Sequence, residues 1–138
     1  MVKTEHVNLG TRGNSEVVNI TEQVENKVAA SNINSGTVTV FVSGSTAALT
    51  TIEYEPGLSS DFKALWNRIA PDNIRYEHNE RWHDGNGYAH IRASLLGPSL
   101  TIPFSDRKLA LGTWQQIILV DFDNRPRERR IVIQMMGE

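Results

Sequence analysis

The sequence predicts an α+β fold, in which a mostly antiparallel β-sheet or sandwich packs with two or three helices. The second half of the chain consists mainly of short β-rich segments separated by turn formers, a pattern typical of an antiparallel meander. The first half alternates strand-like and helix-like segments. The 138 residues fit a single domain, residues 1–138, because no linker or internal repeat divides them.

Four strand-like segments occupy the first half. Residues 3–9 and 16–20 flank the sequence GTRGNS, whose glycines and asparagine predict a hairpin turn between them. Residues 36–44 are rich in valine and threonine, which favour strands. Residues 46–55 then predict a further strand that ends at a proline.

Three segments carry the start and stop signals of helices. Thr21 can cap the first helix, and Ser59 or Ser60 can cap the second, which ends before Pro71. Gly97 and the proline after it end the third. The predicted helices span residues 21–31, 59–70 and 88–96.

The second half contains three segments that mix β-branched and other apolar residues. The last of them alternates, so that Ile131, Ile133 and Met135 share one face. The turn-forming sequences SDR and DNRPR separate the segments. The predicted strands span residues 99–104, 108–122 and 129–136.

Composition excludes several kinds of site. The chain has no cysteine, which excludes disulfides, thiolate zinc sites and a cysteine nucleophile. Its net charge of −2 provides no general field for nucleic acid, so no nucleic-acid partner is expected. No apolar run resembles a signal peptide or approaches the roughly 20 residues of a membrane span. We therefore expect a soluble, cytoplasmic protein with no membrane partner.

The stretch RWHDGNGYAHIRASLLGPS, residues 81–99, raises the main functional question. His83 and His90 lie close together in it, with Asp84 between them and His78 just upstream. Imidazole and carboxylate groups can ligate a divalent metal, but this spacing matches no strict metal motif such as a helical HExxH. A polar surface loop explains the same residues.

Two further segments in the first half offer polar groups. On a strand, Glu53 and Glu55 point to the same face, either as part of a polar outer face or as a general base or metal ligand. The sequence VSGSTAA places Ser45 and Thr46 directly after a strand, where backbone N–H groups and hydroxyls can form a small anion-binding nest. The segment lacks the lysine of a P-loop, so ATP binding is not indicated.

The second half contributes an aromatic residue, an amide and an arginine cluster. In LGTWQQ, Trp114 offers a stacking plane and Gln115 an amide, although Trp114 could instead belong to the core. The cluster RPRERR, residues 125–130, is explained either by a solvated hairpin turn or by an anion clamp that includes Arg127 and Arg129.

Several stretches together resemble the YjbQ family, and the resemblance covers nearly the whole chain. The stretches are GSTAALTTIEYEPGL, YEHN, DGNGYAH, SLLGPSLTIPF, LALGTWQ and RERRIVIQMMGE. The block from LLGPSLTIP through LGTWQ is the family's hallmark. The resemblance implies a compact α+β homotrimer with its site at or near a subunit boundary. It also implies a weak, secondary thiamine-phosphate synthase activity.

The family's polar set, carried over by position, is Glu53, His78, Asp84, Asn86, His90 and Gln115. The chain departs from the family pattern at Gly44, where many members have a histidine that begins a His-Thr-Ser run. Glycine can neither ligate a metal nor transfer a proton. We interpret the departure as the mark of a subfamily, with either a different activity or a different ligand set.

The resemblance leads to two main hypotheses. In the first, the chain couples a pyrimidine diphosphate to a thiazole phosphate and expels pyrophosphate, which requires a divalent ion or cationic groups on the leaving group. In the second, the same residues bind a metal or a phosphate-bearing small molecule without chemistry. A purely structural or interaction module is a third alternative.

Residue roles follow for the enzyme hypothesis. His78 and His90 would bind metal or phosphate, with Glu53 or Asp84 as a further ligand or base. The proposed metal, zinc or magnesium, would be held by His78, His90 and Asp84. The remaining groups would hold the phosphate and the ring: Ser45, Thr46, Asn86, Trp114, Gln115, Arg127 and Arg129.

Overall fold

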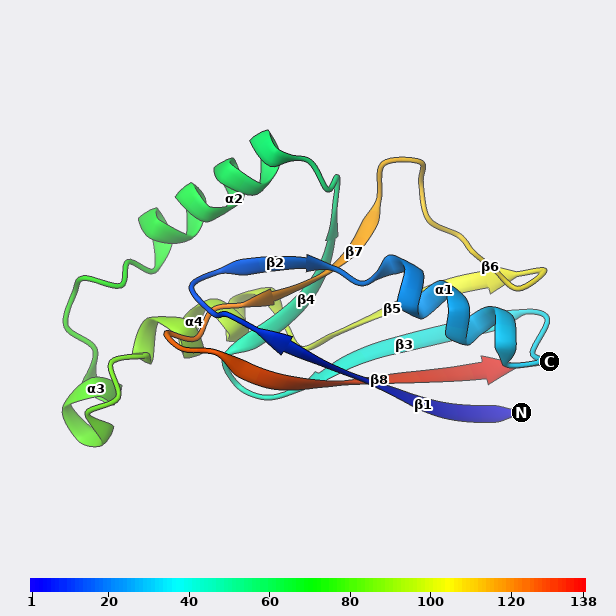
Figure 1. The fold of residues 1–138 in the computed structure, drawn as a ribbon, viewed down its shortest axis with the longest axis horizontal. Helices are drawn as coiled ribbons and strands as arrows, with labels where there is room; N and C mark the ends of the chain where they lie inside the picture. The colour runs from blue at the N-terminus through cyan, green and yellow to red at the C-terminus, as the bar shows by residue number, and fades with distance from the viewer.

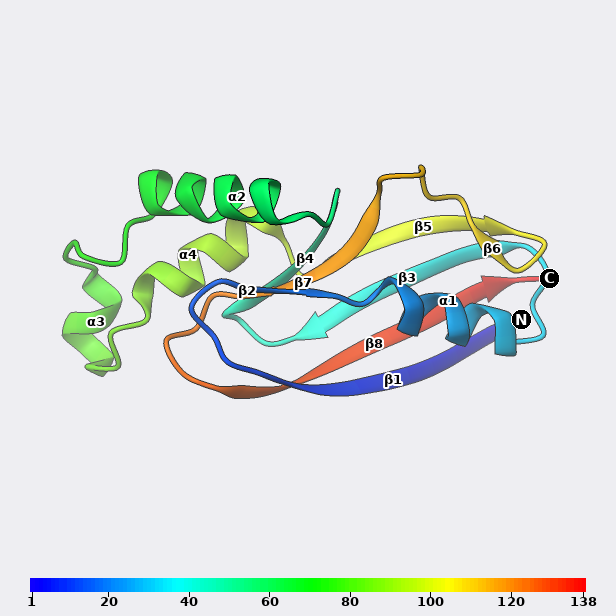
Figure 2. The ribbon, with the colours of Figure 1, turned by 45° about the horizontal axis from the view of Figure 1, so that its top comes forward.

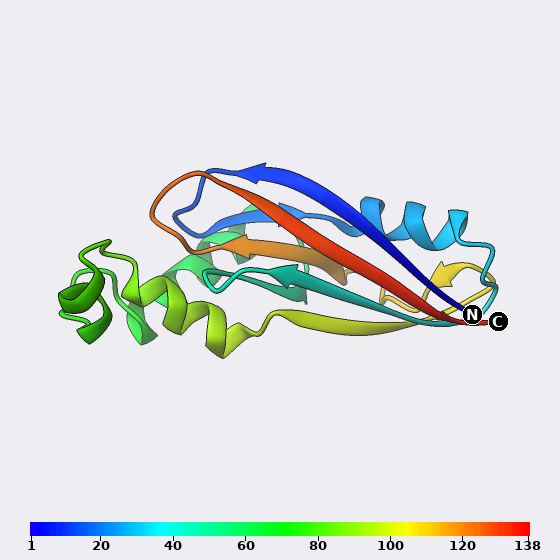
Figure 3. The same ribbon diagram turned by 90° about the horizontal axis from the view of Figure 1, so that it is seen from below.

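A five-stranded antiparallel sheet forms one layer of the computed structural model, which describes residues 1–138 (Figure 1). In spatial order its strands are β1 (Val2–Thr11), β8 (Arg127–Gly137), β3 (Gly36–Ser43), β5 (Ser99–Ser105) and β6 (Lys108–Leu109). The long pairings run from Val2 opposite Met136 to Thr11 opposite Arg127. The two termini therefore lie side by side at one end of the molecule (Figure 3).

A three-stranded antiparallel sheet forms the second layer. Its strands are β2 (Glu16–Asn19), β7 (Gln116–Asp121) and β4 (Ala47–Ile52), in that order. Successive residues of a strand point to opposite faces, and both faces of β7 are buried. Ile117 and Leu119 pack toward the five-stranded sheet, whereas Ile118 and Val120 pack into a second cluster. This explains why the sequence of β7 is continuously apolar.

Four helices complete the fold: α1 (Thr21–Ala30), α2 (Pro56–Ile69), α3 (Glu77–Trp82) and α4 (Gly87–Leu96). Helix α1 buries Val24 and Val28 in the core shared by the two sheets. Helices α2 and α4 cover the outer face of the three-stranded sheet, where Trp66 and Ala89 pack (Figure 2). Helices α2, α3 and α4 thus gather at the end of the molecule away from the termini (Figure 1).

The predicted α+β class with a mostly antiparallel sandwich is confirmed, and so are the three predicted helices. The predicted hairpin of residues 3–9 and 16–20 is wrong, because β1 pairs with β8 and β2 pairs with β7. The segment between β1 and β2 carries the chain from one sheet to the other. Three consecutive residues in it, Gly13 to Ser15, have left-handed backbone angles.

The predicted helix caps are also wrong. Glu55, not Ser59 or Ser60, caps α2: its carboxylate accepts hydrogen bonds from the N–H groups of Gly57 and Leu58. Pro56 then takes the first helical position, where its missing N–H costs nothing. The β4 strand accordingly ends at Ile52, before Glu53.

Thr21 does not cap α1 either. Its hydroxyl donates to the Asn19 side chain (2.7 Å) and accepts from the N–H of Ile117 (2.8 Å). This contact joins the start of the helix to β7.

The predicted strand over residues 108–122 divides into β6 and β7, with a loop between them. In this loop the side chain of Gln115 accepts a hydrogen bond from the N–H of Gly112 (3.0 Å). The short helix α3 was not predicted, because six residues carry no repeated apolar face. No helix in the structure has both the length and the apolar character that crossing a bilayer requires.

Candidate functional site

A polar hollow of about 390 Å³ opens where three segments meet. The β3–β4 connection contributes Gly44, Ser45 and Thr46; the α3–α4 region contributes His78, Trp82, Asp84, Asn86 and His90; and the turn after β7 with the start of β8 contributes Asp123, Arg127 and Arg129. Trp82 is its one hydrophobic lining residue. The sequence places these segments far apart, and the ends of β4, β7 and β8 bring them together.

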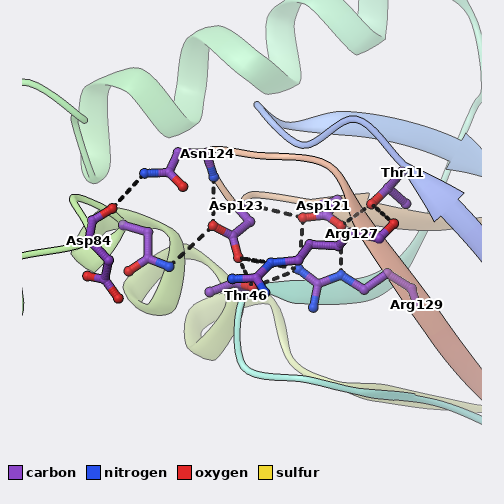
Figure 4. A network of polar contacts seen from close by, with 9 residues as sticks. Thr11, Thr46, Asp84, Asp121, Asp123, Asn124, Arg127 and Arg129 are labelled. Atoms are coloured by element: carbon purple, nitrogen blue, oxygen red, sulfur yellow. Dashed lines mark hydrogen bonds and ion pairs between the residues drawn. The ribbon is translucent and has the colours of Figure 1, made fainter. Parts of the chain in front are cut away.

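Asp123 anchors the floor of the hollow and is fully buried. Its carboxylate accepts hydrogen bonds from Thr46 Oγ1 (2.9 Å), Arg127 Nε (2.9 Å), Asn86 Nδ2 (3.2 Å) and the N–H of Asn124 (2.8 Å) (Figure 4). Burial alone would raise the pKa of this carboxyl, but these hydrogen bonds outweigh it and hold the pKa below its ordinary value. Asp123 is therefore an ionised counter-charge whose oxygens are already occupied.

Asp121 lies two residues before Asp123 and is the buried counter-charge of Arg129. Its two oxygens accept from Arg129 Nε (2.7 Å) and Nη2 (2.9 Å), and one also accepts from the Thr11 hydroxyl (Figure 4). Arg129 Nη2 also donates to Thr46 Oγ1 (2.7 Å). Such fork-to-fork pairing fixes the plane of the guanidinium.

The two arginines retain donors for a ligand. Arg127 uses only Nε in a protein hydrogen bond, and Arg129 uses Nε and Nη2. Both side chains line the hollow, so the remaining Nη groups supply oriented N–H donors there. Along β8 the exposed residues Glu128 and Arg130 alternate with them. The arginine cluster thus combines exposed side chains with two guanidinium groups that line the hollow.

Gly44 leaves room for the guanidinium of Arg129. A Cβ atom added at Gly44 would lie 2.7 Å from Nη1 of Arg129. Any side chain at this position would force the guanidinium to move. The glycine and the position of Arg129 are therefore linked in this chain.

The rings of His78 and His90 lie against each other in the lining of the hollow, with ring centroids 4.5 Å apart. His90 lies on α4, and burial together with the neighbouring His78 lowers its pKa below the ordinary value. Nδ1 of His78 lies 3.4 Å from Oδ1 of Asp84 but is not aligned for a hydrogen bond. His83 has a left-handed backbone at the end of α3 and does not line the hollow.

Two buried polar atoms of the hollow have no hydrogen-bond partner: Nδ1 of His78 and Oδ1 of Asn86. Buried polar groups are normally paired, and exceptions often mark places where a ligand or ion binds. Gly85, with φ of +69°, makes the turn before Asn86. The Asn124 side chain donates to the carbonyl of Asp84 (2.8 Å) and so holds this turn against the β7–β8 connection.

A sequence model of the family described as "UPF0047 protein YjbQ-like" matches residues 5–138. The chain belongs to the YjbQ family. A UPF0047 protein of Archaeoglobus fulgidus is 38% identical over 128 residues, which cover 93% of this chain and 97% of that protein. The UPF0047 protein YugU of Bacillus subtilis is 32% identical over 139 residues, which cover 99% of this chain and all of that protein.

Solved structures of YjbQ-like proteins have the same fold. A protein of unknown function from Sulfolobus solfataricus P2 superposes with a TM-score of 0.90 at 34% identity, over the full length of both chains. A hypothetical protein from Aeropyrum pernix K1 superposes with a TM-score of 0.91 at 30% identity, over 99% of each chain. The same fold thus occurs in proteins described as being of unknown function or as hypothetical.

The structure divides the polar set of the YjbQ family into two groups. His78, Asp84, Asn86 and His90 line the hollow, whereas Glu53 and Gln115 do not. Glu53 follows the end of β4, and Gln115 precedes β7 and donates to Thr51 Oγ1 (3.1 Å). The hollow lies at the other end of β7, and a strand of this length spans about 17–20 Å.

The remaining predicted residues divide in the same way. Ser45, Thr46, Arg127 and Arg129 line the hollow, and Trp114 does not. The alternative that Trp114 belongs to the core is wrong, because 72% of it is exposed. It lies beside Gln115 in the loop between β6 and β7.

Three residues of the site were missed by sequence reasoning. Asp121 falls within the predicted strand of residues 108–122 and Asp123 within the turn sequence DNRPR, so neither was considered as a site residue. Their spacing of two residues, directly after a buried strand and before an arginine cluster, was the available signal. Trp82 has no signal of this kind; 63% of it is exposed at the mouth of the hollow.

The donor set fits a metal only in part. No group of three or more histidine, aspartate or glutamate side chains is arranged to hold a metal ion. The hollow offers two imidazoles and the Asp84 carboxylate, and Gly44 adds no side-chain donor. The buried carboxylates of Asp123 and Asp121 are already paired with Arg127 and Arg129.

Proposed function

We propose that the hollow binds a phosphate-bearing small molecule, and that the chain is a thiamine-phosphate-synthase-like transferase. The observation that carries the proposal is the set of unused guanidinium N–H groups of Arg127 and Arg129, which open into a hollow that also contains two imidazoles. Planar guanidinium groups match phosphate oxygens well.

The reaction needs stabilisation of a leaving group more than it needs a base. The nitrogen lone pair of the thiazole phosphate forms a bond to the methylene carbon of the pyrimidine diphosphate as the carbon–oxygen bond breaks. Pyrophosphate leaves with the electron pair of the broken carbon–oxygen bond, and no proton has to be removed from the attacking nitrogen. Cationic donors oriented in advance toward the leaving oxygens lower such a barrier.

The residues of the hollow would divide this work. Arg127 and Arg129 hold the pyrophosphate oxygens, and Ser45 adds a hydroxyl. Neutral His90, whose pKa is lowered, donates one N–H to a phosphate oxygen. Thr46 positions the clamp, because its hydroxyl already donates to Asp123 and accepts from Arg129.

Turnover tests this proposal. Purified protein is incubated with the pyrimidine diphosphate and the thiazole phosphate, and thiamine phosphate is measured by fluorescence after oxidation. We expect Arg127→Ala to reduce the rate by about 100-fold, the scale for loss of one oriented donor. Arg125→Ala, an exposed arginine of the same turn, is the matched control. Unchanged turnover in Arg127→Ala and in a His78→Ala, His90→Ala double variant would refute the proposal.

A metal-binding function without chemistry is the second candidate. The unpaired buried Nδ1 of His78, the nearby Asp84 carboxylate and the adjacent His90 ring favour it. His78, His90 and Asp84 would hold the bound zinc or magnesium. Mass spectrometry should then find about one ion per chain in the wild type and none in the His78→Ala, His90→Ala double variant. Metal-free wild type after soaking would count against it.

We also propose that the chain forms a homotrimer whose hollow lies at a subunit boundary. Helix α4 carries Ile91, which is 46% exposed and directly follows His90, and Leu95, which is 62% exposed. In such an assembly a partner could bring Glu53, Trp114 and Gln115 toward the hollow of its neighbour. Light scattering gives the oligomeric state. Mixing His90→Ala with Gln115→Ala subunits should restore activity only if both residues serve one shared site.

A further inference from the structure

Helix α4 also borders a second, smaller pocket, which Tyr88 and Arg92 line. These two residues are four apart and share a helix face, whereas His90 lies between them in sequence and about 200° away around the helix. The pocket has a volume of about 140 Å³. It is therefore a separate site from the hollow that His90 lines.

Arg92 is buried, with 3% of its surface exposed, yet none of the ion pairs within 4.0 Å includes it. Its guanidinium donates to neutral acceptors: the Ala70 carbonyl (2.9 Å), Ser15 Oγ (3.0 Å) and Asn67 Oδ1 (3.2 Å). It also stacks on the Tyr88 ring, 4.8 Å from the centroid. Guanidinium has five N–H groups, so three bonds leave two of them without a protein partner.

A buried cation without an anion is unusual on energetic grounds. Removing a charge from water costs several kcal/mol, and proteins normally offset that cost with a paired charge. Arg127 and Arg129 follow this rule, each with a buried aspartate. Burial lowers the pKa of Arg92, although nearby Tyr88 and Asp72 partly oppose the effect. The site therefore favours an anionic partner.

Two more charged residues line this pocket, Lys63 and Asp72, and neither forms an ion pair. With Arg92 they give two cations against one carboxylate. The volume is well below the roughly 300 Å³ at which pockets for drug-sized ligands begin. We infer that the pocket binds a compact oxyanion, such as phosphate, sulfate or a small carboxylate, on the two free N–H groups of Arg92 and the ammonium group of Lys63.

An NMR titration with inorganic phosphate at constant ionic strength tests the inference. Backbone amide signals of Ser15, Asn67 and Tyr88 report on the small pocket, and those of Ser45 and Asn86 report on the hollow. We expect the first set to shift and to saturate, in the wild type and equally in Arg127→Ala. Sulfate and acetate, titrated separately, distinguish tetrahedral oxyanions from carboxylates.

Exposed residues provide variants that should not disturb folding. Lys63→Ala should weaken binding by about two- to fivefold, the scale of an exposed charge contact. Asp72→Asn should strengthen it by a similar factor, because a repulsive charge is removed. Lys108→Ala, an exposed lysine of β6, is the matched control and should leave binding unchanged.

Arg92→Gln should abolish the shifts at Ser15 and Tyr88. If that variant fails to fold, Lys63 and Asp72 decide the matter alone. The inference is overturned if none of the three anions shifts these signals in the wild type. It is overturned as well if Lys63→Ala and Asp72→Asn bind phosphate as Lys108→Ala does.

Discussion

Two arginine-lined pockets lie on opposite faces of α4, and they balance buried charge in different ways. In the hollow, Arg127 and Arg129 are each hydrogen-bonded to a buried aspartate. In the smaller pocket, Arg92 contacts only neutral acceptors. The first arrangement fixes the orientation of the guanidinium groups before a ligand arrives. The second leaves a guanidinium that no carboxylate of the protein contacts directly, although Asp72 lies nearby.

Removal of Asp121 should have the largest effect, because it breaks the balanced arrangement. Asp121→Ala leaves Arg129 buried without its counter-charge, and breaking a buried pair in this way costs about 3–5 kcal/mol. Urea denaturation should show a loss of this size in the free energy of unfolding. Asp61→Ala, an exposed aspartate of α2, is the control and should change it by less than about 0.5 kcal/mol. Equal effects of the two substitutions would contradict the assigned role of Asp121.

Replacement of Arg92 by methionine should cost less than removal of Asp121, because no charged partner is left behind. Arg92→Met loses three hydrogen bonds to neutral acceptors but also removes the burial of an unpaired cation. We expect a loss of about 1–2 kcal/mol in the same urea experiment. A loss as large as that of Asp121→Ala would mean that Arg92 has a charge partner in solution.

The acid sensitivity of the hollow should depend on Asp123. Its pKa in the folded protein lies below the ordinary 3.8, so between these values the folded state binds fewer protons than the unfolded state. The resulting stabilisation is complete above the unfolded pKa and is lost as the pH falls through the folded pKa. Asp123→Asn should lack this step. Urea curves recorded at about pH 7 and about pH 3 should show a smaller pH effect in the variant than in the wild type.

His90 should give the smallest but most specific signal. NMR titration should show it losing its proton below the ordinary 6.5, because burial and His78 both lower its pKa. Just below pH 6.5 the folded protein binds fewer protons at His90 than the unfolded chain does. His90 therefore makes the free energy of unfolding fall as the pH drops below 6.5. His78→Ala should raise the pKa of His90 toward, but not up to, the ordinary value, because burial is the larger cause. A pKa above 6.5 in the wild type would contradict the geometry.

Local patterns in the sequence were enough to predict the class of fold and three helices. The alternation of Ile131, Ile133 and Met135 gave β8, and the proline and glycine signals gave the ends of α2 and α4. Strand partners were not predictable in this way. β1 pairs with β8 across more than a hundred residues, and no local signal distinguishes that pairing from a hairpin with β2.

The candidate site was predicted only in part, for a similar reason. His78, Asp84, Asn86 and His90 are close in sequence, and the structure brings them together in the hollow, whereas His83 stays outside it. Asp121 and Asp123 lie just before the arginine cluster in sequence, but their pairing with Arg129 and Arg127 depends on how the chain turns between β7 and β8, which the local pattern does not specify. Residues that the family resemblance grouped with the histidines, Glu53 and Gln115, lie near the opposite end of β7.

Calorimetric titration with pyrophosphate, without added metal, tests the central claim most directly. The wild type and Arg125→Ala should bind it alike, whereas Arg127→Ala should bind it about 10- to 100-fold more weakly, because charge-assisted hydrogen bonds contribute about 1.5–3 kcal/mol each. That result would establish the hollow as an oxyanion site whose arginines are held ready by buried aspartates. Equal affinity in all three proteins, or no binding at all, would contradict the account.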